Sequence, residues 1–133
     1  METAKTRVLV VDDVHMNLKM AELILKKRLS CDVVLAESGM MALEILSKQR
    51  VDLVLLDVAM PDFDGIETLR VIRQDNRTKD LPVILLTASA DPLTVVKGTE
   101  LHIEDYIRKP FVADDLVTRV GQVLHRHGKP VGQ

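Results

Sequence analysis

The sequence has a single cysteine, almost no aromatic residues and no long apolar run. One cysteine excludes an internal disulfide, and we interpret Cys31 as a small apolar core residue rather than a reactive thiol. The apolar run near the N-terminus is too short for a signal peptide, and no other run approaches the length of a membrane span. We therefore expect a cytoplasmic protein that makes no contact with a membrane.

The chain also lacks a strong charge of either sign. Its net charge is −2 at pH 7, which argues against direct binding of nucleic acid through a basic surface. The 133 residues are 47% hydrophobic and 29% charged, as is typical of one globular domain. We expect this domain to span residues 1–126, with a core at about residues 7–124. Residues 127–133 are expected to form a C-terminal tail. The stretch "HRHGKPVGQ" is expected to be frayed, and its two histidines are expected to have no metal-binding role.

Short runs of strand-forming residues alternate with helical patterns along the chain. Residues 7–11, 51–57 and 82–87 are apolar on both faces, as expected for central strands of a parallel sheet covered by helices. Weaker runs at residues 32–36 and 105–107 are typical of edge strands. A helical segment follows each strand, and the first has an apolar stripe made of Val14, Leu18, Ala21, Leu25 and Leu29. Five strand–helix repeats predict an α/β fold with a doubly wound parallel sheet.

The fourth helical segment, which begins near residue 92, has the weakest pattern. Gly98 lies in its middle, where glycine costs about 1 kcal/mol relative to alanine. The surrounding apolar residues form no clean stripe. This segment is either a poorly patterned surface helix or an element that moves.

Polar side chains lie at or directly after the ends of four predicted strands. They are Asp12, Asp13, Asp57, Thr87 and Lys109. Because ligands of open parallel sheets bind beyond the carboxyl ends of the strands, we expect these side chains to meet in one cleft. Each alone is explained as a cap or turn residue. Those explanations do not account for the whole set.

This set of side chains is suited to phosphoryl chemistry. Three carboxylates at short range repel one another unless a hard cation such as Mg²⁺ lies between them. A carboxylate can act as a nucleophile and carry a covalent aspartyl phosphate. A cation and an ammonium would then neutralise the transferring group, and a hydroxyl could donate to one of its oxygens.

Four segments resemble the receiver domain of two-component response regulators: "VLVVDD", "LVLLDVAMPDFDG", "VILLTAS" and "DYIRKPF". The resemblance covers about residues 7–124. It implies a flavodoxin-like (βα)5 fold with strand order 2-1-3-4-5. It also implies a signalling switch, rather than a turnover enzyme, that takes a phosphoryl group from a histidine kinase or histidine phosphotransfer protein and catalyses its own dephosphorylation.

By this resemblance Asp57 is the phosphoacceptor. Asp12, Asp13 and Asp57, together with the backbone carbonyl of Ala59, are the implied ligands of Mg²⁺, for which Mn²⁺ can substitute. Lys109 is the implied contact of the phosphoryl group, followed by a cis peptide bond to the next proline.

The resemblance also implies a switch. Thr87 supplies the switch hydroxyl, and Tyr106 is the aromatic residue that turns inward on activation. Ala59 and Ser89 occupy positions that tune the lifetime of the phosphoryl group. The surface formed by the fourth helix, fifth strand and fifth helix is expected to control an output partner or domain. The domain is expected to be a monomer or a phosphorylation-dependent dimer.

The sequence departs from the family pattern in "LHIED", where His102 replaces a common glycine, so we expect the fourth helix to finish differently. The stretch "RLSCDV" also lacks the usual glycine. No output domain follows the fifth helix in this sequence, and a stand-alone receiver and one domain of a longer protein both remain possible.

Three other functions are alternatives. One is a receiver-like interaction module that does not depend on phosphorylation. A haloacid-dehalogenase-type phosphatase would need a second aspartate where this chain has Ala59. A flavin- or nucleotide-binding module would need a glycine-rich first loop in place of "DDVHMN".

Overall fold

The computed structural model describes residues 5–59, 65–88, 92–129 and 131. Within these ranges five strands alternate with five helices, and the strands form one parallel sheet of order β2-β1-β3-β4-β5, as predicted. The elements are β1 (Arg7–Val11), α1 (His15–Leu29), β2 (Asp32–Ala36), α2 (Gly39–Lys48), β3 (Leu53–Asp57), α3 (Gly65–Gln74), β4 (Val83–Thr87), α4 (Pro92–Glu100), β5 (Asp105–Arg108) and α5 (Ala113–Arg126).

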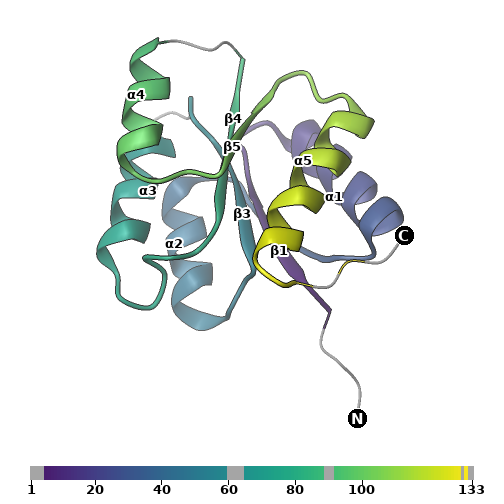
Figure 1. The fold of residues 1–133 in the computed structure, drawn as a ribbon, viewed down its shortest axis with the longest axis horizontal. Coiled ribbons are helices and arrows are strands. Elements are labelled where there is room, and N and C mark those ends of the chain that lie inside the picture. Colours follow the sequence, from purple (N-terminus) through teal and green to yellow (C-terminus); the bar gives the residue numbers. More distant parts are fainter. Residues whose placement is uncertain (1–4, 60–64, 89–91, 130, 132–133) are drawn as a thin grey trace.

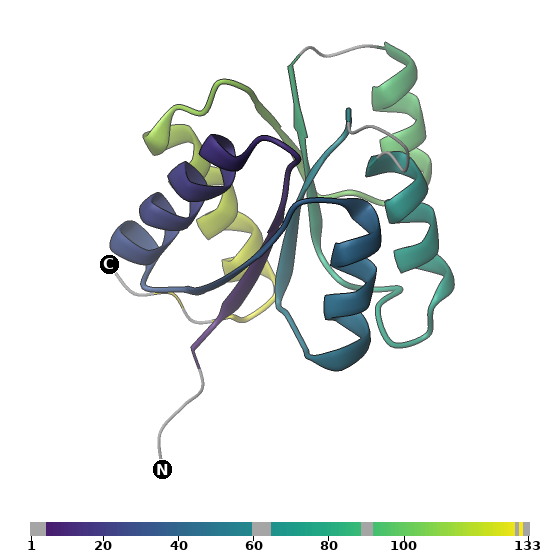
Figure 2. The same ribbon diagram turned by 180° about the vertical axis from the view of Figure 1, so that it is seen from behind.

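Helices cover both faces of the sheet. α1 and α5 lie on one face and α2, α3 and α4 on the other, as Figure 1 and the reverse view in Figure 2 show. Every apolar residue of β3 and β4 is fully buried, which explains why these strands are apolar on both sides. The sheet therefore separates two apolar clusters, one under each layer of helices. No helix among the described residues has the length and apolar character needed to cross a bilayer.

Two elements begin with polar contacts that the sequence specifies. Ser38 caps α2, because its hydroxyl accepts a hydrogen bond of 3.1 Å from the amide of Met41. β3 begins at Leu53, later than the predicted start at residue 51, and the carboxylate of Asp52 instead accepts a hydrogen bond of 2.8 Å from the amide of Arg7. The predicted strand was therefore too long at its N-terminal end.

The end of α4 corrects one prediction. His102 has a left-handed backbone with φ of 58°, and its amide donates to the carbonyl of Thr99 at 3.1 Å. The amide of Ile103 donates to the carbonyl of Gly98 at 3.2 Å, which completes a Schellman motif. The absence of glycine does not change how this helix ends, since His102 takes the left-handed position at a cost of about 1–2 kcal/mol.

Arg73 of α3 holds this helix end in place. Its guanidinium donates to the carbonyls of Leu101 at 2.7 Å and His102 at 3.2 Å. It also donates to the carbonyls of Lys79 at 3.0 Å and Leu81 at 2.8 Å in the loop before β4. One half-buried side chain thus joins three segments by satisfying backbone acceptors that would otherwise depend on water.

Two of the described residues beyond α5 contact the rest of the domain. Lys129 forms an ion pair of 3.3 Å with Asp52, and Val131 packs against the cluster beneath α1 and α5. The frayed tail stays a prediction.

Replacing Arg73 by methionine is expected to lower the free energy of unfolding by about 2–3 kcal/mol, because hydrogen bonds to a charged group are strong and four acceptors lose their donor. Urea denaturation followed by circular dichroism measures this change. Arg70→Met on the same helix is the matched control, since Arg70 is exposed. Equal stability of the two variants would show that Arg73 does not hold these segments.

Candidate functional site

Acidic and basic side chains meet at the carboxyl ends of the central strands. One carboxylate oxygen from each of Asp12, Asp13 and Asp57 lies within 4.8 Å of the others. The ammonium of Lys109 lies 3.0 Å from Asp57 Oδ1 and 3.4 Å from Asp12 Oδ2. Thr87 ends the intervening strand β4, and its carbonyl accepts a hydrogen bond of 2.8 Å from the Lys109 amide. The structure therefore brings together residues that lie up to 97 positions apart in the sequence.

Asp12 is fully buried and held by α1. Its Oδ1 accepts a hydrogen bond of 2.9 Å from the amide of Val14, and its Oδ2 accepts one of 3.1 Å from the side-chain amide of Asn17. Val14 precedes α1 without offering a side-chain cap, so the carboxylate of Asp12 satisfies the exposed amide instead. Sequence reasoning missed Asn17. The sequence indicated its role only weakly, through a side-chain amide in the first turn of a helix that has no capping side chain.

Asp57 is buried in an unfavourable electrostatic environment. The residue is only 1% exposed, and its Oδ2 accepts no hydrogen bond from the described part of the chain. Burial raises the pKa of Asp57 to about 6 from its ordinary 3.8, and the charges of Asp12 and Asp13 add to this rise while the Lys109 hydrogen bond opposes it. Burial would lower the pKa of Lys109, but the hydrogen bond and charge of Asp57 outweigh burial and raise it.

This donor set fits a hard divalent cation. Carboxylate oxygens are the ligands that Mg²⁺ prefers, and the Oδ2 atom of Asp57 is a buried acceptor that a cation or a hydrogen-bond donor would satisfy. Asp13 is exposed and gives the cluster an open side. Ala59 is also exposed, two residues beyond Asp57, and its role as a carbonyl ligand stays a prediction. Ser89 lies outside the described residues, and its role is likewise untested.

The backbone around Asp57 is tightly packed. A Cβ atom on Gly65 would overlap the Asp57 carbonyl oxygen and lie 2.9 Å from the Cα of Val58. The Gly65 amide donates a hydrogen bond of 3.0 Å to the Val58 carbonyl. Only glycine fits here, so the start of α3 is fixed against the peptide that carries Asp57. On the other side of the site, the Lys109–Pro110 peptide bond is cis, as predicted.

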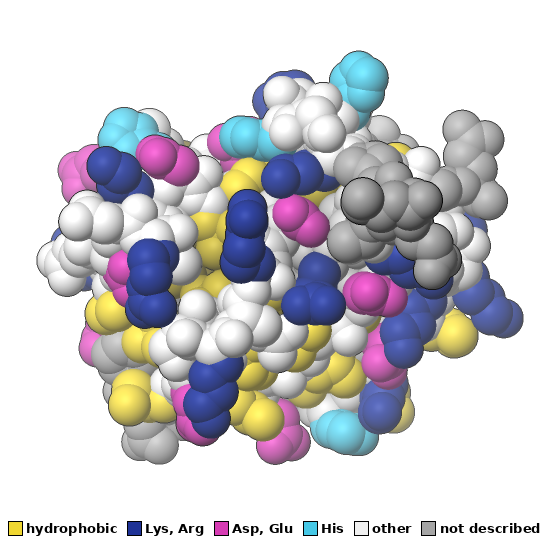
Figure 3. Space-filling model, turned by 90° about the horizontal axis from the view of Figure 1, so that it is seen from below, with side chains coloured by type: hydrophobic (Ala, Val, Ile, Leu, Met, Phe, Trp, Pro, Cys, Tyr) yellow, Lys and Arg dark blue, Asp and Glu magenta, His cyan; other side chains and the backbone are white. Residues whose placement is uncertain are grey.

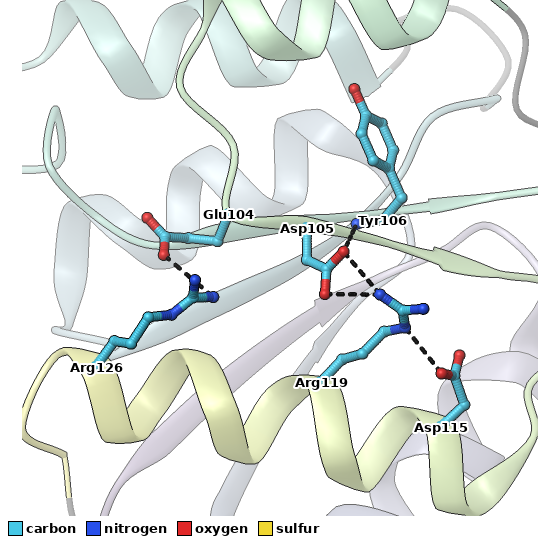
Figure 4. Close-up of polar contacts among 6 residues, drawn as sticks. All are labelled: Glu104, Asp105, Tyr106, Asp115, Arg119 and Arg126. Carbon is cyan, nitrogen blue, oxygen red and sulfur yellow. Dashed lines mark hydrogen bonds and ion pairs between the residues drawn. The ribbon is translucent and has the colours of Figure 1, made fainter.

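Tyr106 and Asp105 point to opposite sides of β5 (Figure 4). The Tyr106 hydroxyl donates a hydrogen bond of 2.9 Å to the carbonyl of Val95 in α4. Asp105 instead accepts two hydrogen bonds of 2.9 Å from Arg119 of α5, which also donates to Asp115 at 2.8 Å. β5 is thus joined to α4 by a tyrosine hydroxyl and to α5 by an aspartate–arginine ion pair.

A separate hollow of about 810 Å³ lies at the opposite end of the sheet, between the loops that precede β3 and β4 and the end of α5. In the view from below, Lys and Arg side chains lie among Asp and Glu side chains (Figure 3). Lys129 pairs with Asp52, and Arg77 with Asp75 at 3.0 Å. These charges are paired within the chain, whereas Asp57 at the other end retains an oxygen with no hydrogen-bond partner among the described residues.

Similarity to known proteins agrees with this geometry. The family model of the response regulator receiver domain matches residues 8–121. The DNA-binding response regulator MtrA of Mycobacterium tuberculosis is 39% identical over 127 residues, which are 96% of this chain and 54% of the relative. The transcriptional regulatory protein CpxR of Escherichia coli is 39% identical over 120 residues, which are 90% of this chain and 50% of CpxR.

Solved structures give the same result. The chemotaxis response regulator CheY4 of Vibrio cholerae superposes with a TM-score of 0.86 at 29% identity, covering 91% of this chain and all of CheY4. A response regulator receiver protein of Pseudomonas putida has a TM-score of 0.84 at 30% identity and covers 91% of this chain and 99% of its own.

The chain belongs to the receiver domain family of two-component response regulators. It spans about half the length of the curated relatives that it matches.

The raised pKa of Asp57 predicts a pH dependence in metal-free buffer. An unfolded aspartate ionises near 3.8 but the folded one near 6, so this group makes the fold less stable as pH rises from about 4 to 6. The full shift corresponds to roughly 3 kcal/mol. Asp57→Asn is therefore expected to be more stable than wild type at pH 7.5, by about 1–3 kcal/mol, with the difference shrinking towards pH 4.

Denaturation at several pH values in the presence of a chelator measures this difference. Asp114→Asn is the control, because the side chain of Asp114 is 85% exposed. A pH profile that Asp57→Asn leaves unchanged would contradict the assigned pKa.

Proposed function

We propose that this receiver domain is a phosphorylation-dependent switch that accepts a phosphoryl group on Asp57. The observation that supports this most directly is the buried carboxylate of Asp57. One oxygen has no hydrogen-bond donor among the described residues, and the other already contacts an ammonium. A phosphoryl acceptor requires a carboxylate that is held in place and incompletely satisfied.

The donor is a phosphohistidine of a histidine kinase or histidine phosphotransfer protein. A carboxylate oxygen of Asp57 attacks phosphorus and forms the P–O bond of an acyl phosphate. The P–N bond breaks, and its electron pair stays on the imidazole nitrogen, which then takes up a proton. The domain would lose the phosphoryl group again to water, so its turnover is that of a switch and not of a conventional enzyme.

Asp12, Asp13, Asp57 and the carbonyl of Ala59 would hold Mg²⁺, or Mn²⁺ in its place. When bound, the metal supplies positive charge that neutralises the phosphoryl oxygens. Lys109 already contacts both buried carboxylates. Once Asp57 carries the phosphoryl group, the ammonium can pair with a phosphoryl oxygen instead of the free carboxylate.

The phosphodonor requires a surface next to the site. Met16, Met20 and Leu23 recur at helical spacing on α1 and are 73%, 43% and 56% exposed. α1 begins at the site, because the amide of Val14, the residue before α1, and the side chain of Asn17 donate hydrogen bonds to Asp12. This exposed apolar stripe suits a helix of the donor protein, which would bring the phosphohistidine to Asp57.

The output is a change in the surface of α4, β5 and α5. Thr87 would bind the phosphoryl group and Tyr106 would turn inward into the space that Thr87 leaves. Moving a population from 1:99 to 99:1 requires about 5.5 kcal/mol of differential stabilisation. Two or three charge-assisted hydrogen bonds of about 1.5–3 kcal/mol each can supply it. The remodelled surface would bind a partner, an output domain or a second copy of the receiver.

Phosphorylation is tested by intact mass after incubation with acetyl phosphate and Mg²⁺. Wild type is expected to gain one phosphoryl group, and Asp57→Asn none, because the acceptor carboxylate is gone. Asp114→Asn should gain it as wild type does. Uptake by Asp57→Asn would place the acceptor elsewhere. No uptake by wild type would favour an interaction module that does not depend on phosphorylation.

Mg²⁺ is expected to stabilise the wild-type fold by relieving repulsion between carboxylates, by roughly 1–3 kcal/mol at high excess over Kd. Thermal unfolding with and without Mg²⁺ measures the effect, and Asp12→Asn should greatly reduce it. A melting temperature of wild type that does not respond to Mg²⁺ would exclude a functional metal site.

A further inference from the structure

Gly98 is buried in the middle of α4 and faces Tyr106. A Cβ atom at this position would lie 2.7 Å from the Tyr106 hydroxyl, which is closer than side chains pack. It would also lie 3.0 Å from Ile103 Cδ1 and 3.2 Å from Leu85 Cδ1. Glycine disfavours a helix by about fivefold relative to alanine. Glycine is therefore present here although alanine would make the helix itself more stable.

The hydroxyl that occupies this space cannot move freely. Tyr106 Oη donates to the Val95 carbonyl at 2.9 Å, three residues before Gly98 in the same helix. The Thr99 hydroxyl donates to the same carbonyl at 2.9 Å. Val95, Gly98 and Thr99 therefore form a notch in α4 that holds the Tyr106 hydroxyl by a hydrogen bond and by shape.

We propose that Gly98 is a positioning residue for the switch. By leaving room for the Tyr106 hydroxyl, it couples the Tyr106 ring to α4, so that the ring leaves only when the bond to Val95 breaks or α4 moves with it. The coupling itself depends only on the packing of α4 on β5. Its role in signalling rests on the function proposed above, in which Tyr106 is the switch aromatic.

Packing against Ile103 and Leu85 is a competing explanation for the glycine. Both contacts involve the terminal carbons of flexible side chains, which can shift by a few tenths of an ångström. The Tyr106 hydroxyl donates a hydrogen bond to the helix backbone and cannot shift away without lengthening that bond. Removing this one oxygen therefore separates the two explanations.

A double-mutant cycle makes this separation. Gly98→Ala in wild type is expected to lower the melting temperature, despite the higher helix preference of alanine. In the Tyr106→Phe background the same substitution is expected to raise it, because the shortest contact is gone and the roughly fivefold helix preference of alanine remains. Effects of the same sign and size in both backgrounds would overturn the proposal.

Gly121→Ala on α5 is the matched control. A Cβ atom there meets only Leu29 Cδ2 at 4.0 Å, so alanine should stabilise both backgrounds equally. The cycle needs no phosphoryl group and is therefore independent of the proposed function.

The ring itself can be observed because the chain has one Tyr and no Trp. Incorporating 3-fluorotyrosine gives a single ¹⁹F resonance from Tyr106. Gly98→Ala is expected to shift this resonance before any phosphodonor is added, and Gly121→Ala is expected to leave it unchanged. An unmoved resonance in Gly98→Ala would overturn the coupling. Phosphoryl uptake of the same samples, followed by intact mass, reports separately on the proposed function.

Discussion

The arrangement of this domain depends on two buried carboxylates that share one ammonium. Asp12 and Asp57 lie at the ends of the paired strands β1 and β3, with almost no exposed surface. Like charges at such positions repel strongly, because little water is present to screen them. Lys109 neutralises only part of this charge, and the amide of Val14 and the side chain of Asn17 compensate Asp12 further. Part of the negative charge of Asp57 remains uncompensated, and the chemistry of the site follows from this charge.

The two sides of the site differ in how firmly they are fixed. The Asp57 peptide lies in a fully buried strand and is packed against Gly65, so this side has no room to adjust. On the other side α4 is held at its C-terminal end by Arg73 and contacts β5 through the hydroxyl of Tyr106. α4 is thus anchored at its C-terminal end, and the bond from Tyr106 to Val95 is a described polar contact between its middle and β5. In the function proposed above, a phosphoryl group on Asp57 would therefore change the structure mainly on the α4 side.

The parallel α/β fold and the cluster of site residues could be predicted from local patterns, whereas the strand order was implied only by the resemblance to receiver domains. Apolar runs mark the buried strands, and Asp57 and Lys109 occur in motifs at fixed positions after them. The role of Arg73 could not be predicted, since its acceptors are backbone carbonyls that carry no sequence signal. His102 showed that a missing glycine need not change a helix end. Gly98 was recognised as unfavourable, but its close tertiary neighbours, Tyr106 first among them, carry no local sequence signal.

The position of Lys109 late in the chain also has a consequence for biosynthesis. A chain made only as far as β4 contains Asp12 and Asp57 but lacks Lys109, which follows Asp57 by 52 positions. Pairing β1 with β3 on the ribosome would bring the two carboxylates together before their counter-charge exists. Addition of β5 therefore contributes an electrostatic gain as well as one more strand, and the nascent domain reaches its full stability only after β5 and Lys109 have emerged.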